Sequence, residues 1–454
     1  MTPPGSSLSL KHRIRRSHPL RPTMTRTLAQ LDHADQETLS RYQNRRLQLL
    51  VRLAAARSPF YRAWFREAGV DPASIRTVAD LARLPLLDRS QLITGAEQFL
   101  VYPDQLLWPA RSSGTSGAPV TSYRTPGSSV FELSVLERQW SWFGLGRSPR
   151  RVILRGQFKT DPGEPPVKLL PGANQLLVWS YGLTPETLPA IVSAIRDFHP
   201  DAIEGWPSAI TVLASLLRDQ GLTLPVRAII TSSEVMTTAQ TDLMRAVFRG
   251  PIVDHYGQTE RVAMAGSCEA GGYHLFPDYG IVELLPVPGI EDRWEIVGTA
   301  LHNWGFPLFR YRTGDHVRAA DPGPCSCGRS FPALGRIDGR VEDCFASVDG
   351  RPLPMPSIIL DDLANVRESQ IAQRGPGRFE VRVVPTAGFD LPAVTARIGA
   401  SADRYFGPGQ SISLRLVSAI PRTASGKLRS AIIDPDNAVP ASVPASVPAP
   451  APAS

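Results

Sequence analysis

The residues best suited to chemistry begin with a small polar loop at residues 111–119, whose sequence is RSSGTSGAP. Serine and threonine hydroxyls lie beside glycines, so no bulky side chain screens the backbone N–H groups. Such a loop can close around phosphate oxygens, although loops of this composition are more often plain connectors. It lacks the Gly-Lys-Ser/Thr ending of a Walker A loop, which argues against a P-loop kinase or ATPase. A phosphate-binding loop of another kind and a simple connector both remain open.

A second set of residues has the chemistry of a metal site. Cys268 and His274 are six positions apart, and Cys325 and Cys327 follow about fifty residues later. Three thiolates and one imidazole complete a tetrahedral Zn²⁺ site of the closed, structural type. The Cys-x-Cys spacing is tighter than in the usual zinc knuckle, and unrelated buried thiols are the alternative. If Zn²⁺ binds, we expect it to pin two loops of the large domain and to take no part in catalysis.

Four more motifs follow the first loop in order along the chain. They are YGQTE at 256–260, YRTGD at 311–315, GRVED at 339–343 and PRTASGK at 421–427. Each alone could be a turn or a strand end, but five short patterns in a fixed order are far more specific. Together they resemble the motifs of adenylate-forming ligases, which include acyl-CoA synthetases, peptide-synthetase adenylation domains and luciferases.

The resemblance implies that a carboxylate attacks the α-phosphorus of ATP while pyrophosphate leaves, so the protein must hold two anions together. Lys427 would bring a compact ammonium to the α-phosphate and carboxylate oxygens. Thr259 would reach the phosphate, and Glu260 would bind Mg²⁺, a hard ion that prefers carboxylate oxygen. The residues that the resemblance assigns to nucleotide binding are Ser112, Ser113, Gly114, Thr115, Ser116, Gly117, Ser233, Glu234, Tyr256, Gly257, Asp315 and Arg340.

Within this set, the loop would hold the β- and γ-phosphates of ATP. Tyr256 would lie on the adenine face, Asp315 would accept both ribose hydroxyls, and Arg340 would contact a phosphate. Relatives often carry a lysine where Val120 stands here, so one positive charge is missing from the loop. Glu342 matches the hinge position of the family's Gly-Arg-x-Asp pattern, with glutamate in place of aspartate. GRID at 335–338 also fits that pattern, although the spacing after it fits less well. Rotation at the hinge would let one site serve two half-reactions.

Within the superfamily, the chain looks most like the phenylacetate–CoA ligase-like branch that is associated with capsule biosynthesis. The likeness extends from about Gln43 to Ser430 and rests on five features, which are SPFY at 58–61, EGWPS at 204–208, TSSE at 231–234, the Cys/His set and QIAQ at 370–373. The Gly-Val-Asn-rich loop that follows the hinge in phenylacetate–CoA ligases is replaced by ASVDGRPLP at 346–354. The acceptor of the acyl group is therefore CoA or an amine or amino acid.

A small, aromatic acid is the expected substrate. Trp179, Tyr181, Trp206 and Tyr256 could line an apolar acyl pocket, or they could be core residues. A catalytically silent, zinc-stabilised binding protein on the same fold is a further alternative. The presence of Lys427 together with the Glu260 and Asp315 motifs argues against it.

The elements that must position these residues follow from hydrophobic periodicity. Strands at 152–154, 226–230 and 251–253 alternate with amphipathic helices that begin near Thr184 and Ser208, which predicts an α/β fold with substantially parallel sheets. A helix is expected from about residue 41, with Leu47, Leu50, Val51 and Ala54 facing inward. Strands at 379–384 and 411–417 around a helix near 391–398 predict a small, mobile α+β domain at the C-terminal end.

The expected domain organisation has four parts. Residues 1–30 form a basic flexible leader, 31–339 a large ATP- and acyl-binding domain, 340–435 a small C-terminal domain that carries Lys427, and 436–454 a disordered Pro/Ala/Ser tail. The leader could be a basic arm for nucleic acid or an anionic surface, although a disordered leader from an early start codon is preferred.

The overall composition limits the class of protein. The 454 residues carry a formal charge of +7, with 42% apolar and 20% charged residues, as in ordinary globular proteins. Acids and bases are mixed after the leader, so no nucleic-acid partner is expected. No run could span a bilayer, no apolar signal-peptide core is present, and four cysteines do not suggest a disulfide framework. A cytoplasmic location is therefore expected.

Overall fold

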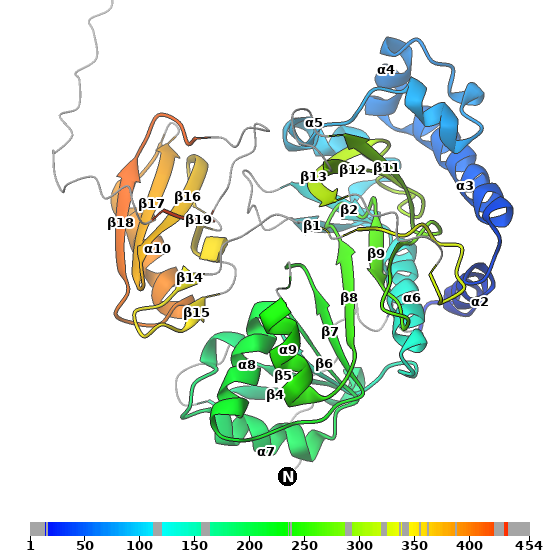
Figure 1. Cartoon of the computed structure of the whole chain (residues 1–454). Coiled ribbons are helices and arrows are strands. Elements are labelled where there is room, and N and C mark those ends of the chain that lie inside the picture. The colour runs from blue at the N-terminus through cyan, green and yellow to red at the C-terminus, as the bar shows by residue number, and fades with distance from the viewer. Residues whose placement is uncertain are drawn as a thin grey trace, which may run out of the picture. The chain divides into compact units, whose positions relative to one another are not determined.

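A computed structural model describes residues 14, 17–111, 120–155, 164–234, 236, 238–286, 293–318, 325–335, 337, 345–353, 356–360, 363–385, 388–421 and 431–434. The chain forms two compact units, Met1–Glu342 and Asp343–Ser454 (Figure 1), and each unit is treated separately below. The boundary lies close to the expected division after residue 339. No helix in the described ranges is long and apolar enough to cross a bilayer.

The large unit is built around an eight-stranded sheet with the order β10-β9-β8-β7-β6-β3-β5-β4. The five strands from β8 to β5 are parallel, whereas β9, β10 and β4 pair antiparallel. The expectation of an α/β fold with substantially parallel sheets is therefore confirmed. The strands are β3 (Arg151–Leu154), β4 (Val167–Leu170), β5 (Gln175–Val178), β6 (Ala202–Gly205), β7 (Ala228–Ser232), β8 (Ile252–Gly257), β9 (Met264–Ser267) and β10 (Tyr273–Leu275).

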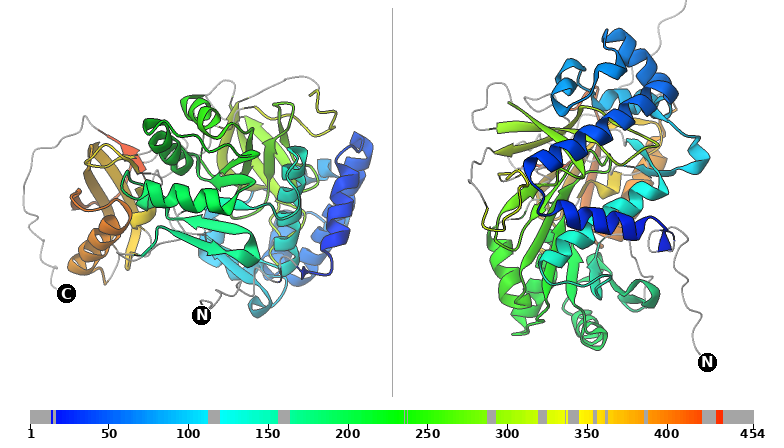
Figure 2. Two further views of the ribbon diagram at one scale, coloured as in Figure 1. Left: turned by 90° about the horizontal axis from the view of Figure 1, so that it is seen from below. Right: turned by 90° about the vertical axis from the view of Figure 1, so that its right-hand side faces the viewer.

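Helices cover both faces of this sheet (Figure 1, Figure 2). Alternate residues of the buried strands point to opposite faces, so Ile203 and Ile229 join one apolar cluster, whereas Ala202 and Ile230 join another. The first cluster includes residues of α7 (Leu188–Phe198), α8 (Pro207–Asp219) and α9 (Thr238–Phe248), and the second includes Trp140 of α6 (Pro126–Trp142).

The sheet changes its direction of growth between β3 and β6. After β3 the chain adds β5 on one side through the edge strand β4, and it then returns through α7 to add β6 on the other side of β3. In open α/β sheets, ligands bind outside the carboxyl ends of the strands at such a switch point. The carboxyl edge of β3, β6, β7 and β8 is therefore the part of the sheet to inspect for function.

The rest of the large unit carries the other predicted motifs. β1 (Trp108–Arg111) and β2 (Thr121–Arg124) pair antiparallel on either side of the Ser/Gly loop. A three-stranded antiparallel sheet follows the order β11-β12-β13. Its strands are β11 (Gly280–Pro286), β12 (Arg293–Ala300) and β13 (Tyr311–Arg318), and β13 contains YRTGD.

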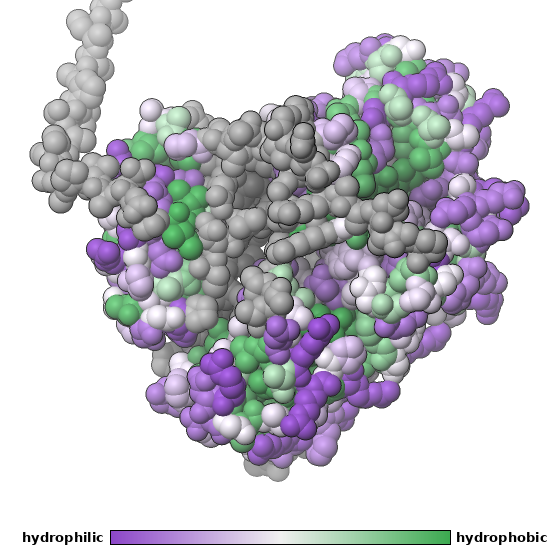
Figure 3. All heavy atoms as spheres, in the orientation of Figure 1, coloured by the Kyte–Doolittle hydropathy of each residue, from purple (hydrophilic) through white to green (hydrophobic). Residues whose placement is uncertain are grey.

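The N-terminal helices are α2 (Arg21–Leu31), α3 (Gln36–Arg57), α4 (Pro59–Glu67) and α5 (Arg89–Gly95). The expected inward face of α3 is confirmed, because Leu47, Leu50, Val51 and Ala54 are buried. The helix begins earlier than expected, since the side chain of Asp35 caps it by accepting from the N–H of Thr38. Its outer face contributes to the hydrophilic surface on the right of Figure 3.

The expected flexible leader needs correction for residues 21–30. These residues belong to α2, whose Leu28 is fully buried in a cluster with Phe131 of α6. Arg21 also forms a 2.6 Å ion pair with Glu137. Prolines and arginines made this helix hard to predict, and many of the residues in its apolar cluster, such as Phe131, are more than a hundred positions away.

Two other helices differ from the expectation in their ends. The helix expected to open at Thr184 begins as an α-helix only at Leu188, after a turn in which the hydroxyl of Thr187 donates to the carbonyl of Gly182. α8 begins at Pro207 and ends before Gly221, whose φ of +64° suits glycine.

The smaller unit contains a four-stranded sheet with the order β18-β17-β16-β19 and the helix α10 (Leu391–Tyr405). Val394 and Ile398 of α10 pack with Phe379 and Val381 of the sheet, so the expected α+β unit is present. The helix is longer than expected. The strands of the unit are β14 (Phe345–Ala346), β15 (Pro352–Leu353), β16 (Val366–Gly375), β17 (Arg378–Pro385), β18 (Ser411–Leu416) and β19 (Ala431–Ile433).

Candidate active site and metal centre

The predicted site residues fall into two groups. The residues that lie outside the described ranges are Ser112, Ser113, Gly114, Thr115, Ser116, Gly117, Arg340, Glu342 and Lys427. The residues that the structure describes are Ser233, Glu234, Tyr256, Gly257, Thr259, Glu260 and Asp315, all in the large unit, together with the four Cys/His residues.

Tyr256 and Asp315 join two motifs that are far apart in the sequence. Tyr256 lies near the end of β8, Asp315 lies on β13, and the tyrosine hydroxyl donates a 2.8 Å hydrogen bond to Oδ2 of Asp315. Burial raises the pKa of Tyr256 well above its usual value, and the nearby Asp315 charge adds to the effect. The hydroxyl therefore stays protonated and can act as the donor. The amide of Gln258 also donates to this hydroxyl over 2.8 Å.

Thr259 is tied to the strand that follows the Ser/Gly loop. Its carbonyl oxygen accepts from the hydroxyl of Ser122 over 3.2 Å and from Nη2 of Arg124 over 3.1 Å. Both donors belong to β2, which begins two residues after the loop ends at Pro119. The YGQTE motif and β2 are therefore neighbours in space.

Glu260 is a buried carboxylate, with only 4% of the residue exposed. The hydroxyl of Tyr311 donates to its Oε1 over 3.0 Å, and Nη1 of Arg89 lies 3.8 Å from the same oxygen. Tyr311 is the first residue of YRTGD, so this motif contacts the YGQTE motif twice. Both contacts involve Oε1, which leaves Oε2 for a cation such as Mg²⁺ with respect to the described residues.

Ser233, Glu234 and Gly257 lie at the carboxyl edge of the parallel sheet. Ser232 pairs with His255 where β7 runs beside β8, so Ser233 follows β7 at the edge where Gly257 ends β8. Ser233 has a φ of +75°, a left-handed conformation that is uncommon for residues other than glycine. A Cβ at Gly257 would meet no atom of the described residues within 4 Å.

Sequence reasoning missed the residues that hold this site in place. Ser122, Arg124 and Arg89 fall outside every motif, and nothing in their spacing indicates that they reach the YGQTE segment. Tyr311 could have been found, because it is the first residue of the YRTGD motif.

The four predicted metal ligands converge in the large unit. One ligand atom from each of Cys268, His274, Cys325 and Cys327 lies within 4.8 Å of all the others. The sulfur of Cys268 lies 3.7 Å from the sulfur of Cys325, and the sulfur of Cys327 lies 3.5 Å from Nε2 of His274. Tetrahedral Zn²⁺ with bonds of about 2.3 Å to sulfur and about 2.0 Å to nitrogen would separate its ligands by roughly 3.5–3.8 Å. The donor set and its spacing fit Zn²⁺.

Neighbouring groups orient the metal ligands and set the tautomer of His274. Nδ1 of His274 lies 3.1 Å from the carbonyl oxygen of Phe331, so Nδ1 carries the proton and Nε2 is left to coordinate. Gly272 passes so close that a Cβ there would come within 2.8 Å of the Cys325 sulfur and 3.1 Å of Nε2 of His274. The turn between Cys268 and His274 therefore requires glycine at this position.

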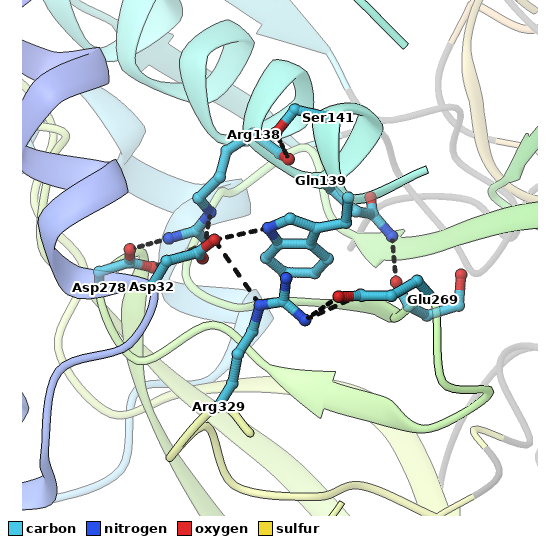
Figure 4. Close-up of polar contacts among 9 residues, drawn as sticks. Asp32, Arg138, Gln139, Ser141, Glu269, Asp278 and Arg329 are labelled. Atoms are coloured by element: carbon cyan, nitrogen blue, oxygen red, sulfur yellow. Dashed lines mark hydrogen bonds and ion pairs between the residues drawn. The ribbon is translucent and has the colours of Figure 1, made fainter. Parts of the chain in front are cut away.

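A buried network of charges adjoins the Cys/His residues (Figure 4). Arg329, two residues after Cys327, forms a 2.8 Å ion pair with Glu269, the residue after Cys268. The Arg329 guanidinium also lies 3.9 Å above the ring of Trp142 and 3.6 Å from Asp32. The ion pair therefore joins the two segments that carry the cysteines.

On the other side of Asp32, Arg138 of α6 lies 3.5 Å from Asp32 and forms a bidentate pair with the fully buried Asp278. Burial raises the pKa of Asp278, and the charge of Arg138 opposes this effect. The network connects the end of α2, α6 and the Cys/His segments into one folded region.

Comparison with known proteins finds phenylacetate–CoA ligases and protein CapK as relatives. No family model matches the chain. A phenylacetate–coenzyme A ligase of Thermus thermophilus is 27% identical over 443 aligned residues, which cover 89% of this chain and 98% of that protein. Protein CapK of Staphylococcus aureus is 22% identical over 400 residues, which cover 86% of this chain and 88% of CapK.

Solved structures show the same fold. A 2-hydroxyisobutyryl-CoA ligase, in complex with 2-HIB-AMP and CoA in its thioesterification state, aligns with a TM-score of 0.60 at 20% identity. The alignment covers 96% of this chain and 94% of that one. The ordered motifs, the fold and these relatives agree: the chain is similar to phenylacetate–CoA ligases and CapK, and it is an enzyme of the adenylate-forming ligase class.

Proposed function

We propose that this enzyme uses ATP to convert a small carboxylic acid into an acyl-AMP and then transfers the acyl group to the thiol of CoA. The observation that carries the proposal is the junction of two motifs in the large unit. Tyr256 donates to Asp315, and Tyr311 donates to Glu260, so each motif positions a carboxylate-bearing residue through a tyrosine of the other. Two fixed carboxylates suit the ribose and the Mg²⁺ of a bound nucleotide.

In the first half-reaction, an oxygen of the acid's carboxylate attacks the α-phosphorus of ATP, and the bond to pyrophosphate breaks. Asp315 would accept the ribose hydroxyls while its Oδ2 is held by Tyr256. Thr259 would reach the phosphate from a backbone fixed by Ser122 and Arg124. Glu260 would hold Mg²⁺, which neutralises phosphate charge when bound.

The remaining roles come from motif matches. Residues 112–117 would enclose the β- and γ-phosphates, Ser233, Glu234 and Gly257 would contact the nucleotide, and Lys427 would neutralise the charge that develops between carboxylate and α-phosphate. Arg340 would contact a phosphate beside the hinge.

In the second half-reaction, the sulfur of CoA attacks the acyl carbonyl carbon, and the bond to AMP breaks. Rotation of the smaller unit about Glu342 would withdraw the Lys427 loop from the site after the first half-reaction. It would bring in another surface of the same unit, which admits the acceptor. CoA is preferred because the relatives include phenylacetate–CoA ligases and the solved neighbour is a CoA ligase. An amine or amino acid as acceptor is the alternative, since the loop at 346–354 departs from the phenylacetate–CoA ligase pattern.

We also propose that Cys268, His274, Cys325 and Cys327 bind one structural Zn²⁺. The support is the convergence of four ligand atoms within 4.8 Å and the histidine whose second nitrogen is held by a carbonyl. Four protein ligands leave no open position for a substrate, so the metal would stabilise the fold. Metal analysis of the purified protein should give one zinc per chain, and the absence of zinc would contradict this assignment.

The test of the proposed reaction measures pyrophosphate release from ATP and Mg²⁺ with a panel of aryl and aliphatic acids. Hydroxylamine serves first as a general acceptor, and CoA or amino acids replace it afterwards. With hydroxylamine as acceptor, we expect pyrophosphate release that depends on the presence of an acid. With CoA as acceptor, we expect an acyl-CoA product. An amide product in place of the thioester would select the amine alternative, and no release with any acid would contradict adenylation.

A further inference from the structure

A row of polar side chains, none of which has been assigned to the nucleotide, lies at the switch point of the large sheet. Arg155 follows the last residue of β3, Glu204 precedes the last residue of β6, Ser232 ends β7, and His255 lies near the end of β8. The strand register places these side chains on the sheet face that α6 covers, because Arg151 stacks on Trp140 of that helix and lies on the same face as Arg155.

Arg155 reaches across the carboxyl ends of three strands. Its Nη2 atom lies 3.0 Å from Oε1 of Glu204 and 3.0 Å from the hydroxyl of Ser232. The guanidinium therefore starts on β3, passes the end of β6 and contacts β7. A side chain fixed at both strands loses little conformational freedom when it binds a further group.

Arg155 is not the only arginine that neutralises Glu204. Arg151 already pairs with Oε2 of this carboxylate, and 9% of the Arg151 side chain is exposed, compared with 26% for Arg155. Burial disfavours the charge of Glu204, but the two arginines outweigh burial and lower the pKa of this carboxyl. One ionised glutamate is thus shared by two arginines, of which Arg155 is the one that meets solvent.

In the group formed by Arg151, Arg155 and Glu204, two guanidinium charges meet one carboxylate charge. Burial and the nearby Arg155 lower the pKa of His255 to about 4, so the imidazole is neutral at pH 7. The next pair, Arg261 with Glu132, is balanced in itself. Nε of Arg155 and Nδ1 of His255 are buried without a hydrogen-bond partner in the part of the chain that the structure describes. Polar atoms that are left this way in a native fold commonly meet a ligand or water.

We propose that Arg155 forms the polar end of the acid-binding pocket and selects carboxylic acids that carry a second anionic group, such as a second carboxylate. This inference rests on the proposed function, because it names the substrate class of the same reaction. The carboxyl edge at a switch point is where ligands of open α/β sheets bind. A guanidinium forms strong, directional hydrogen bonds to a carboxylate, and one would balance the second guanidinium charge at Glu204.

The experiment compares acids that differ by one carboxylate. Two pairs suffice, hexanoate with adipate and phenylacetate with 4-carboxyphenylacetate, each assayed for pyrophosphate release with hydroxylamine as acceptor. We expect kcat/KM of the intact enzyme to be about 10- to 100-fold higher for the acid with two carboxylates, the range of a charge-assisted hydrogen bond. Arg155→Met should abolish this preference for the acid with two carboxylates, and Arg155→Lys should keep part of it.

The matched control is Arg227→Met. Arg227 precedes β7 at the opposite edge of the same sheet and pairs with Asp201, so its loss should leave the ratio unchanged. Thermal unfolding of each variant separates loss of folding from loss of selectivity. The inference is overturned if the intact enzyme shows no preference within either pair, or if Arg155→Met keeps the preference. If no acid of any kind releases pyrophosphate, the proposed function fails and the inference fails with it, whereas turnover that is indifferent to Arg155 overturns the inference alone.

Discussion

The hydroxyl of Tyr256 donates a 2.8 Å hydrogen bond to Oδ2 of Asp315, although 59 positions separate the two residues in the chain. One residue ends a parallel strand of the eight-stranded sheet, and the other lies in the antiparallel β13. A single contact therefore fixes the aromatic ring proposed for the adenine face relative to the carboxylate proposed for the ribose. Its loss should affect the nucleotide more than the acid.

Tyr256→Phe keeps the ring and removes this hydrogen bond. A hydrogen bond to a charged group contributes about 1.5–3 kcal/mol, so we expect kcat/KM for ATP to fall about 10- to 100-fold. The kcat/KM for the acid at saturating ATP should change less. Pyrophosphate release at varied ATP concentration measures the effect, with Tyr102→Phe as a control for a tyrosine outside the site. An unchanged dependence on ATP would show that the contact does not position the nucleotide.

The Cys/His residues give a prediction about glycine. In Gly272→Ala the new Cβ would lie 2.8 Å from the Cys325 sulfur and 3.3 Å from the Cys268 sulfur, so the ligands must move. We expect zinc content well below one per chain and a Tm lower by several degrees, because structural zinc contributes directly to folding. Gly146→Ala, where the Cβ meets nothing within 4 Å, is the matched control. Full zinc content in Gly272→Ala would contradict the assigned ligand geometry.

The charged network of Figure 4 predicts a large loss of stability when one partner is removed. Arg138→Met would leave Asp278, which is fully buried, without its bidentate partner. Breaking a buried ion pair from one side costs about 3–5 kcal/mol of unfolding free energy. Urea unfolding should show this loss, and the double variant Arg138→Met with Asp278→Asn should recover part of it. Equal stability of the single and double variants would mean that the pair is not coupled.

A buried histidine makes stability depend on pH. The ring of His302 stacks on Phe131, and burial together with the Arg46 charge lowers its pKa well below 6.5. Below about pH 6.5 the unfolded chain binds a proton that the folded protein does not, so the unfolding free energy falls as the pH falls. The contribution of one such group approaches about 1.4 kcal/mol per pH unit.

The slope of unfolding free energy against pH tests this contribution. Urea unfolding between pH 7 and 5.5 should show a smaller decrease for His302→Gln than for the unchanged protein. The comparison cancels the groups that the two proteins share, including the buried Asp254, whose pKa is raised by burial. Identical slopes would mean that His302 is protonated in the folded state.

The parts of the fold that the sequence predicted are those with local signals. The alternation of strands and amphipathic helices indicated the parallel sheet, and the stripe from Leu47 to Ala54 indicated α3. Residues that act through distant contacts could not be found this way. α2 is stabilised by packing on α6, and Arg89 reaches Glu260 across 171 positions of the chain. No periodicity encodes such pairs.

In the candidate site, too, local motifs could be predicted from the sequence and distant contacts could not. The motifs named Tyr256, Glu260 and Asp315, and the Cys/His spacing named four residues whose ligand atoms do converge. Ser122 and Arg124 donate to the carbonyl of Thr259, and Gln258 donates to Tyr256, but only the folded chain shows these hydrogen bonds. The roles of Ser112–Gly117, Arg340, Glu342 and Lys427 stay predictions, because these residues lie outside the described ranges.

The central claim is that this chain activates an acid by adenylation, and Lys427 offers the most direct test. The measurement is acid-dependent pyrophosphate release by the unchanged enzyme, by Lys427→Ala and by Lys168→Ala, a matched loss of an exposed lysine on β4. We predict release by the unchanged enzyme and by Lys168→Ala, and a loss of at least about 100-fold in Lys427→Ala, as expected when a group that stabilises transition-state charge is removed. Release by Lys427→Ala at the rate of the unchanged enzyme would contradict the proposed mechanism.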